Sequence, residues 1–123
     1  DAAREDVLLG QQFVEPLHLA EFHSQTFDIP EGAAKLIDGR PECPNQAFRI
    51  GAATYAFQPH LEVTPASMTQ WVKGSEKLVA QHAPDLPQEL PRLLDLHHYA
   101  GHDFCWKVGH AWFALAAERM ARG

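Results

Sequence analysis

The sequence is poor in cysteine, in basic residues and in long apolar runs, and each shortage excludes a class of protein. Only two cysteines occur, Cys43 and Cys105, which are too few and too far apart for a disulfide framework. Ten lysines and arginines stand against 16 aspartates and glutamates, and the resulting net charge of −6 disfavours binding to nucleic acid or to an anionic lipid surface. No apolar run approaches the roughly 20 residues that a membrane-spanning helix needs. We therefore expect a cytoplasmic protein with no nucleic-acid partner and no membrane partner.

What the chain does contain is an ordinary globular balance. Of its 123 residues, 46% are hydrophobic and 21% are charged, which suits one small domain. The sequence begins at Asp1, with neither a methionine nor a signal-peptide pattern before the first globular residues. We therefore expect residues 1–123 to form part of a larger domain.

The first half of that domain, residues 1–64, is expected to be rich in strands. Its short β-type runs are separated by turn residues, and Gly51 lies between the last two runs as in a hairpin. Pro59 cannot donate to a β-ladder, so the last strand should end near Gln58. Residues 38–44 have the composition of a loop, which would contain Cys43. The expected strands are residues 17–23, 33–37, 47–50 and 53–57.

The second half, residues 65–123, has the pattern of a helical tail. Thr64 can act as an N-cap, and Pro65 stands at the first helical position, where its missing N–H costs little. Apolar residues then recur at helical spacing to about His82. After a break at residues 83–87 we expect a short helix over residues 88–98 and, beyond Gly101, a C-terminal helix packed on the sheet.

The most informative stretch is residues 57–64, Phe-Gln-Pro-His-Leu-Glu-Val-Thr, where a strand is expected to end. In an extended chain, side chains two apart project to the same side, so His60 and Glu62 should meet there. An imidazole that a carboxylate orients is the base and acid of a catalytic triad. The sequence therefore predicts a catalytic pair that still needs a nucleophile.

The nucleophile and a metal are the two groups that the sequence does not supply. Cys43 falls in the expected proline-rich loop and Cys105 on the expected apolar helix face, so neither has the setting of a reactive thiol. His98 and His102 are four apart on a possible helix, but Gly101 lies between them and no familiar ligand set is complete. We expect no metal and no cofactor.

Three ordered motifs resemble the C-terminal half of class I glutamine amidotransferase domains, particularly the stand-alone type similar to the amidotransferase part of GMP synthase. The motifs are residues 22–33, Phe-His-Ser-Gln-Thr-Phe-Asp-Ile-Pro-Glu-Gly-Ala, residues 44–48, Pro-Asn-Gln-Ala-Phe, and residues 57–64. Together they cover about residues 15–75. The resemblance implies an α/β fold, the C-terminal half of a flavodoxin-like three-layer domain with mixed strands and a helical tail.

The same resemblance implies chemistry and partners. His60 would be the general base and Glu62 its orienting acid, while His23, Ser24 and Gln25 would border the pocket for the substrate, glutamine. The nucleophilic cysteine of this family lies on a Gly-x-Cys-x-Gly elbow, which these residues lack, so it would come from a missing N-terminal half. A synthase would accept the ammonia. The 123 residues alone are then expected to be inactive.

Two other functions fit the same motifs. Pro59 replaces an aromatic residue of the family pattern, Leu61 replaces a proline, and Ser24-Gln25 replaces Gly-Asp. Such substitutions are what a non-catalytic amidotransferase-like module for binding or regulation would accumulate. A γ-glutamyl hydrolase of the same fold would use the same triad, and only its substrates would distinguish it.

Overall fold

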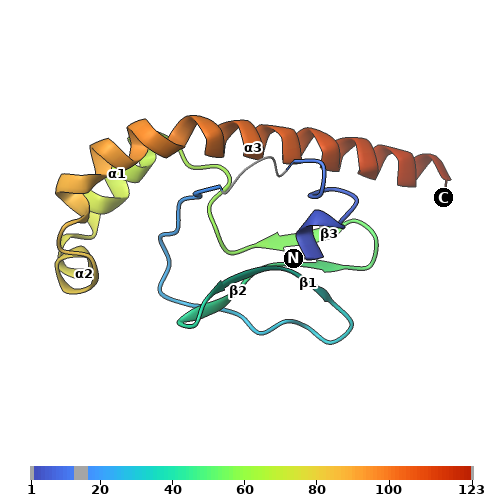
Figure 1. Cartoon of the computed structure of the whole chain (residues 1–123), viewed down its shortest axis with the longest axis horizontal. Coiled ribbons are helices and arrows are strands. Elements are labelled where there is room, and N and C mark those ends of the chain that lie inside the picture. The colour runs from blue at the N-terminus through green and yellow to red at the C-terminus, as the bar shows by residue number, and fades with distance from the viewer. Residues whose placement is uncertain (1, 13–16, 123) are drawn as a thin grey trace.

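In a computed structural model, which describes residues 2–12 and 17–122, one long helix lies across a small antiparallel sheet (Figure 1). The sheet has the order β1-β2-β3, with β1 at Ala34–Arg40, β2 at Cys43–Ile50 and β3 at Thr54–Phe57. The helices are α1 at Pro65–Gly74, α2 at Glu76–His82 and α3 at Leu86–Arg122, and a short 3-10 turn, η1, spans Ala2–Arg4. The described chain is therefore a mixed α/β protein.

The sheet is built from two consecutive hairpins. Arg40 pairs with Cys43 across the first turn, and Ile50 pairs with Thr54 across the second. Gly51 opens the second turn with a φ of +58°, a left-handed conformation that a residue without Cβ adopts at little cost. The Arg49 guanidinium donates to the Gly51 carbonyl and closes this turn. β3 then runs back along β2 and carries the chain toward His60.

The strand predictions are confirmed in part. The hairpin around Gly51 is present, and β3 ends at Phe57, as Pro59 predicts. The loop expected over residues 38–44 is wrong, because β1 and β2 continue to a tight turn, and Cys43 is the first residue of β2. The strand expected at residues 17–23 is also wrong, since only Ala20 pairs there, in an isolated antiparallel bridge with His60.

The start of α1 is the predicted one. Thr64 Oγ1 accepts a hydrogen bond of 3.1 Å from the Ser67 amide, and Ser67 Oγ accepts one of 2.9 Å from the Thr64 amide. This reciprocal capping box satisfies two amides that no helical carbonyl reaches. The helix ends earlier than predicted, because Ser75 separates it from α2.

α3 is one continuous helix of 37 residues, so the break predicted at Gly101 is wrong. Gly101 is buried where α3 crosses the segment that leads to Ala20. A Cβ at this position would lie 3.5 Å from the His18 carbonyl oxygen and 3.6 Å from the Leu19 side chain. Both distances are ordinary van der Waals separations, so the continuous helix accommodates Gly101 without a close approach that would require glycine.

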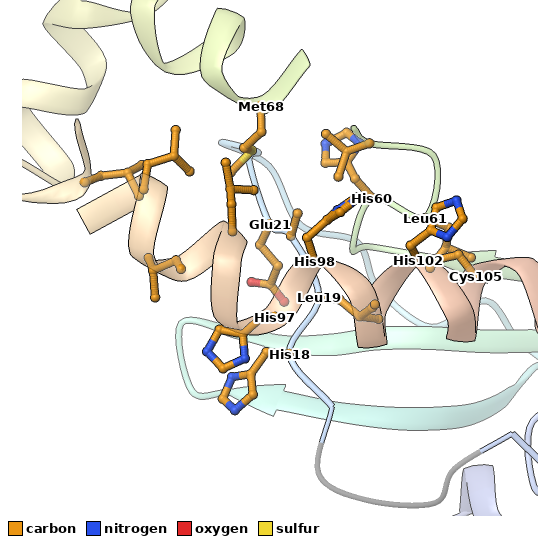
Figure 2. A pocket seen from close by; sticks show the side chains of 17 residues that line it. His18, Leu19, Glu21, His60, Leu61, Met68, His97, His98, His102 and Cys105 are labelled. Atoms are coloured by element: carbon orange, nitrogen blue, oxygen red, sulfur yellow. The ribbon is translucent and has the colours of Figure 1, made fainter. Parts of the chain in front are cut away.

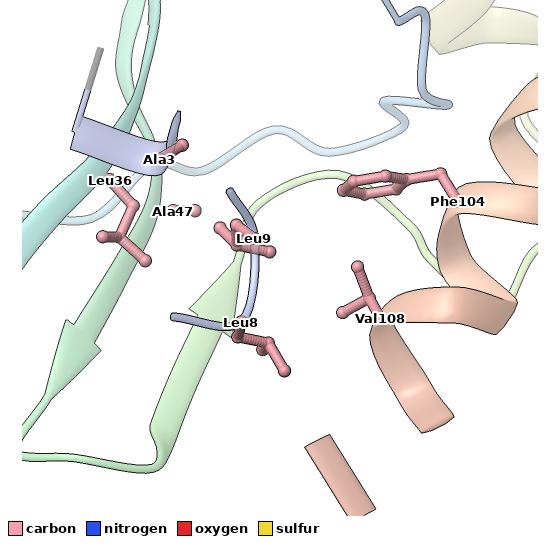
Figure 3. Close-up of a cluster of buried hydrophobic side chains, with 7 residues drawn as sticks. All are labelled: Ala3, Leu8, Leu9, Leu36, Ala47, Phe104 and Val108. Atoms are coloured by element: carbon pink, nitrogen blue, oxygen red, sulfur yellow. The ribbon is translucent and has the colours of Figure 1, made fainter. Parts of the chain in front are cut away.

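Two hydrophobic clusters hold the molecule together, and α3 contributes to both. In the first, the N-terminal turns pack between the sheet and the middle of α3 (Figure 3). In the second, α1 and α2 pack against the beginning of α3. The first cluster consists of Ala3, Leu8, Leu9, Leu36, Ala47, Phe104 and Val108, and the second of Met68, Val72, Val79 and Leu90.

A buried carboxylate ties the N-terminal turn to the sheet. Asp6 accepts hydrogen bonds from the amides of Leu8 and Leu9, from the Tyr55 hydroxyl at 2.9 Å and from Arg49 Nε at 2.9 Å. Burial acts to raise the pKa of Asp6, but these hydrogen bonds outweigh it and the pKa lies below its usual value. Asp6 is therefore held as a carboxylate inside the fold.

Candidate functional site

His60 and Glu62 meet just after β3. The His60 amide donates to the Ala20 carbonyl at 2.8 Å, which fixes the backbone at the point where the sheet has ended. Glu62 Oε1 then lies 2.8 Å from His60 Nδ1. A carboxylate can only accept, so Nδ1 carries the proton of this hydrogen bond. The two side chains project to the same side, as their spacing predicts.

The His60 ring is held from two further sides. Its Nε2 lies 3.4 Å from the Phe22 carbonyl oxygen, and its face lies 4.7 Å from the Trp71 ring, measured between centroids. Phe22 and Trp71 stack at 6.0 Å. Both ring nitrogens therefore face oxygen atoms of the chain. To act as a base, Nε2 has to move away from the carbonyl and face a substrate.

Glu62 is placed to stay ionised. Burial acts to raise the pKa of its carboxyl, but hydrogen bonds from its own backbone amide and from the His60 ring outweigh this effect, as does the nearby imidazole charge. The net pKa lies below its usual value of 4.5. Since the side chain remains largely exposed, this carboxylate orients His60 from the solvent side.

The predicted pocket residues are distant from this pair in the sequence and approach it only through the neighbouring Phe22. His23 Nδ1 bonds to the Gln25 carbonyl at 2.8 Å, and its other nitrogen lies 3.7 Å from Glu21. His23, Ser24 and Gln25 follow directly after Phe22, whose carbonyl faces His60. None of the three lines the cavity at His60. The structure therefore brings their backbone near the pair and leaves their side chains on the exposed segment.

A cavity of about 390 Å³ opens between α3 and the segments that carry Ala20 and His60. Figure 2 shows the α3 histidines facing these two segments. The polarity of the cavity lining changes along α3. The lining residues from Leu86 to Leu94 are leucines, and those from His97 to Cys105 are mostly histidines. The polar lining consists of His18, Glu21, His60, His97, His98, His102 and Cys105.

The α3 residues of this cavity are the part of the site that sequence reasoning missed. His98, His102 and Cys105 recur at helical spacing, so they share one side of α3 and line the same cavity as His60, whereas His97 lies beside His18. The sequence shows the spacing of His98 and His102, but the cavity that they line depends on contacts between distant segments. The ring centroids of His18 and His97 lie 4.3 Å apart, and those of His98 and His102 lie 5.8 Å apart.

Cys105 is close to the pair but is not an activated thiol. It packs against the hydrophobic core, as its expected place on the apolar helix face predicts, and it also lines the same cavity as His60. Burial, with a smaller contribution from the Glu62 charge, raises its pKa to about 11. A thiol at this pKa carries almost no thiolate at neutral pH. Cys43 lies outside this cavity, and its Sγ contacts Thr26 Oγ1 at 3.4 Å.

Metal binding and membrane insertion have clear structural requirements. Within residues 2–12 and 17–122, no three side chains of histidine, cysteine, aspartate or glutamate are grouped so that they could hold a metal ion.

In the same part of the chain, none of the helices combines the length and the apolar character needed to span a bilayer.

Comparison with known proteins does not add to this geometry. No protein-family model matches the chain, and no curated protein matches it significantly. The site is therefore defined by its own contacts: a histidine and a carboxylate in hydrogen-bond contact beside a cavity lined by leucines and imidazoles.

Proposed function

We propose that this chain supplies the general base and the orienting acid for hydrolysis of the side-chain amide of glutamine. One observation carries the proposal: His60 Nδ1 and Glu62 Oε1 lie 2.8 Å apart directly after a strand. The cysteine of the resulting Cys-His-Glu triad is not among these 123 residues. The protein would thus be a glutamine amidotransferase or glutaminase, and an unidentified synthase would accept the ammonia.

The chemistry assigns a step to each group. A thiolate attacks the amide carbon while His60 Nε2 accepts the thiol proton, and this proton then leaves with ammonia as the C–N bond breaks. Water attacks the thioester, again with His60 as base, and glutamate is released. Glu62 keeps the proton on Nδ1 and stabilises the imidazolium between these steps. The contact between Nε2 and the Phe22 carbonyl has to open before the first step.

The test is ammonia release from glutamine by a longer gene product that contains a nucleophile elbow. His60→Ala should lower kcat by roughly 10²–10⁴-fold, the usual contribution of a general base, and Glu62→Gln should lower it strongly as well. His82→Ala is the matched control, because His82 is exposed at the end of α2. Unchanged turnover in a folded His60→Ala variant would remove His60 from the mechanism.

Cys105 requires a separate variant, because it lines the same cavity as His60. Cys105→Ser should keep full turnover, since the thiol pKa of about 11 leaves too little thiolate to attack an amide. For the same reason the 123-residue chain by itself should release no ammonia. Glutaminase activity of this chain that disappears with Cys105→Ser would identify Cys105 as the nucleophile and contradict the proposal.

A non-catalytic binding module is the second candidate, and the contact between His60 Nε2 and the Phe22 carbonyl favours it. A histidine whose two nitrogens are both occupied can serve as a structural link between the segments of Phe22 and Glu62. In that case the longer product would bind glutamine, as measured by calorimetry, without releasing ammonia. The substitution His60→Ala would then lower the stability of the protein, and neither the parent nor the variant would release ammonia.

A further inference from the structure

A row of large apolar side chains lies on the face of α3 that is turned away from the sheet. Tyr99, Trp106, Phe113 and Met120 are each seven residues apart, and Leu96 precedes the first of them by three. They are exposed to 57% (Leu96), 82% (Tyr99), 63% (Trp106), 69% (Phe113) and 84% (Met120). These five residues are called the heptad stripe below.

The heptad stripe is separate from the core and from the site at His60. Residues Phe104 and Val108 face the sheet, and Trp112 donates from Nε1 to the Ala53 carbonyl at 2.8 Å, which anchors that side of the helix. At 100° per residue, Trp106 and Phe113 project to the opposite side. In Figure 1 the sheet lies below α3, and none of the described elements lies above it.

A helix that is apolar on both faces needs a second partner to cover the outer one. A period of seven residues is the period that two supercoiled helices share, because it keeps one seam facing the partner along the whole contact. Single exposed apolar side chains are common on protein surfaces, but a regular row along about 36 Å of helix is a contiguous patch. The spacing therefore indicates a helix as the partner.

We propose that the heptad stripe is a dimer interface and that a second copy of this chain covers it with the same helix. Five large side chains at this exposure leave roughly 600 Å² of apolar surface per chain, since an aromatic side chain has about 150–250 Å² to bury. Two copies together would bury about 1,200 Å², the lower limit of stable specific interfaces. An isologous pair needs only one such surface, which each chain carries.

The polar residues within the row select the antiparallel arrangement. Asp103 and His110 continue the three-four spacing of the heptad stripe. A parallel pair would set Asp103 against Asp103 of the other copy, and like charges inside a seam destabilise it. An antiparallel pair centred near Val108 places Asp103 of each chain within about one helical turn of His110 of the other. An imidazole N–H can donate to a carboxylate, so only the antiparallel orientation gives Asp103 a hydrogen-bond partner on the other copy, in addition to its ion pair with Lys107 at 2.6 Å on its own helix.

The experiment is sedimentation velocity on the complete 123-residue chain, with circular dichroism to monitor folding. The chain should sediment with twice its mass of 13.7 kDa, and the double variant W106E/F113E should sediment with the monomer mass and unchanged helix content. Leu78→Glu is the matched control, because Leu78 is exposed on α2 and lies outside the heptad stripe, and it should remain a dimer. A monomeric parent chain, or a dimer that survives W106E/F113E, would overturn the proposal.

Orientation is tested by disulfide trapping in a background in which Cys43 and Cys105 are replaced by serine. His110→Cys lies near the centre of the seam and should cross-link to its own copy, whereas Leu96→Cys near its end should not. Cross-linking of both variants would show a parallel pair and overturn the antiparallel arrangement. Neither His110 nor Leu96 lines the cavity at His60, so the cross-linking result is independent of the proposed amide hydrolysis.

Discussion

At the scale of single residues, Asp6 joins two parts of the fold through four hydrogen bonds. Its side chain is 1% exposed and joins the N-terminal turn to Arg49 on β2 and Tyr55 on β3. A buried carboxylate is tolerated only when hydrogen bonds replace its lost hydration, and here two amides, a hydroxyl and a guanidinium do so. The position of the N-terminal turn therefore depends on one charge.

Asp6→Asn should lower the free energy of unfolding by about 3 kcal/mol, because the amide keeps the volume but loses the ion pair with Arg49 and faces donors with its own N–H groups. Urea denaturation followed by circular dichroism measures this change. Asp38→Asn is the control, since the ion pair of Asp38 with Lys35 is exposed and should be worth less than about 1 kcal/mol. Equal effects of the two substitutions would show that the Asp6 network does not stabilise the fold.

The same network predicts how stability depends on pH. Burial and the hydrogen bond to Asp6 raise the pKa of Tyr55 from 10 to about 12, so its contribution is complete below pH 10 and is lost as the pH rises toward 12. The pKa of Asp6 is lowered, so its contribution is present above its usual value of 3.8 and is lost as the pH falls through the folded value. Stability should therefore decrease at both ends of the pH range.

The substitution Tyr55→Phe isolates the loss of stability that is expected at alkaline pH. The melting temperature of the variant should be lower than that of the parent at neutral pH, and this difference should shrink between pH 10 and 12. Thr69→Ala is the control, because the Thr69 hydroxyl does not titrate in this range and bonds only to the Pro65 carbonyl of its own helix, so its difference from the parent should not change with pH. A difference between Tyr55→Phe and the parent that stays constant over this range would contradict the assignment.

At the scale of elements, a capping box of Thr64 and Ser67 stabilises the first turn of α1. The sequence predicts the part of Thr64 but not that of Ser67. Thr64→Ala removes the acceptor for the Ser67 amide and should destabilise the protein by about 1 kcal/mol. Thr69→Ala is a matched substitution within the same helix, where the hydroxyl only bonds back to the Pro65 carbonyl, and it should be neutral or slightly stabilising. Thermal unfolding distinguishes the two, and a Thr69→Ala loss as large as that of Thr64→Ala would contradict a capping role.

The long α3 shows where local sequence signals fail. Glycine lowers helix propensity by roughly 1 kcal/mol, and the sequence around Gly101 accordingly predicts an interruption. The contacts that Phe104 and Val108 make in the core favour the continuous helix instead. Because these contacts come from residues far away in the sequence, no local pattern contains them. The spacing of His98 and His102 is visible in the sequence, but the cavity that they line with Cys105 is not.

At the scale of the whole molecule, α3 is the element that joins the two hydrophobic clusters. It supplies Leu90 to the cluster of α1 and α2, and Phe104 and Val108 to the cluster of the sheet. Since a single helix carries both sets, opening one cluster disturbs the helix that supports the other. We therefore expect the described part of the chain to unfold as one cooperative unit.

Leu9→Ala and Leu90→Ala test this expectation from the two clusters. Each should cost about 2–5 kcal/mol, the usual range for a buried leucine, and each should shift the urea curves of tryptophan fluorescence and of circular dichroism together. Leu78→Ala is the control, because Leu78 is exposed, and it should change stability by less than about 0.5 kcal/mol. Two separate transitions in either variant would mean that the clusters unfold independently.

The sequence by itself determined the features that depend on neighbouring residues. The turn at Gly51, the cap at Thr64 and the meeting of His60 with Glu62 all follow from backbone geometry over a few positions. Only the tertiary structure decided that α3 continues through Gly101, that Asp6 is buried, and that Cys105 and the α3 histidines line one cavity with His60. These features depend on burial and on contacts between distant segments, whose energies exceed the local preferences of the residues involved.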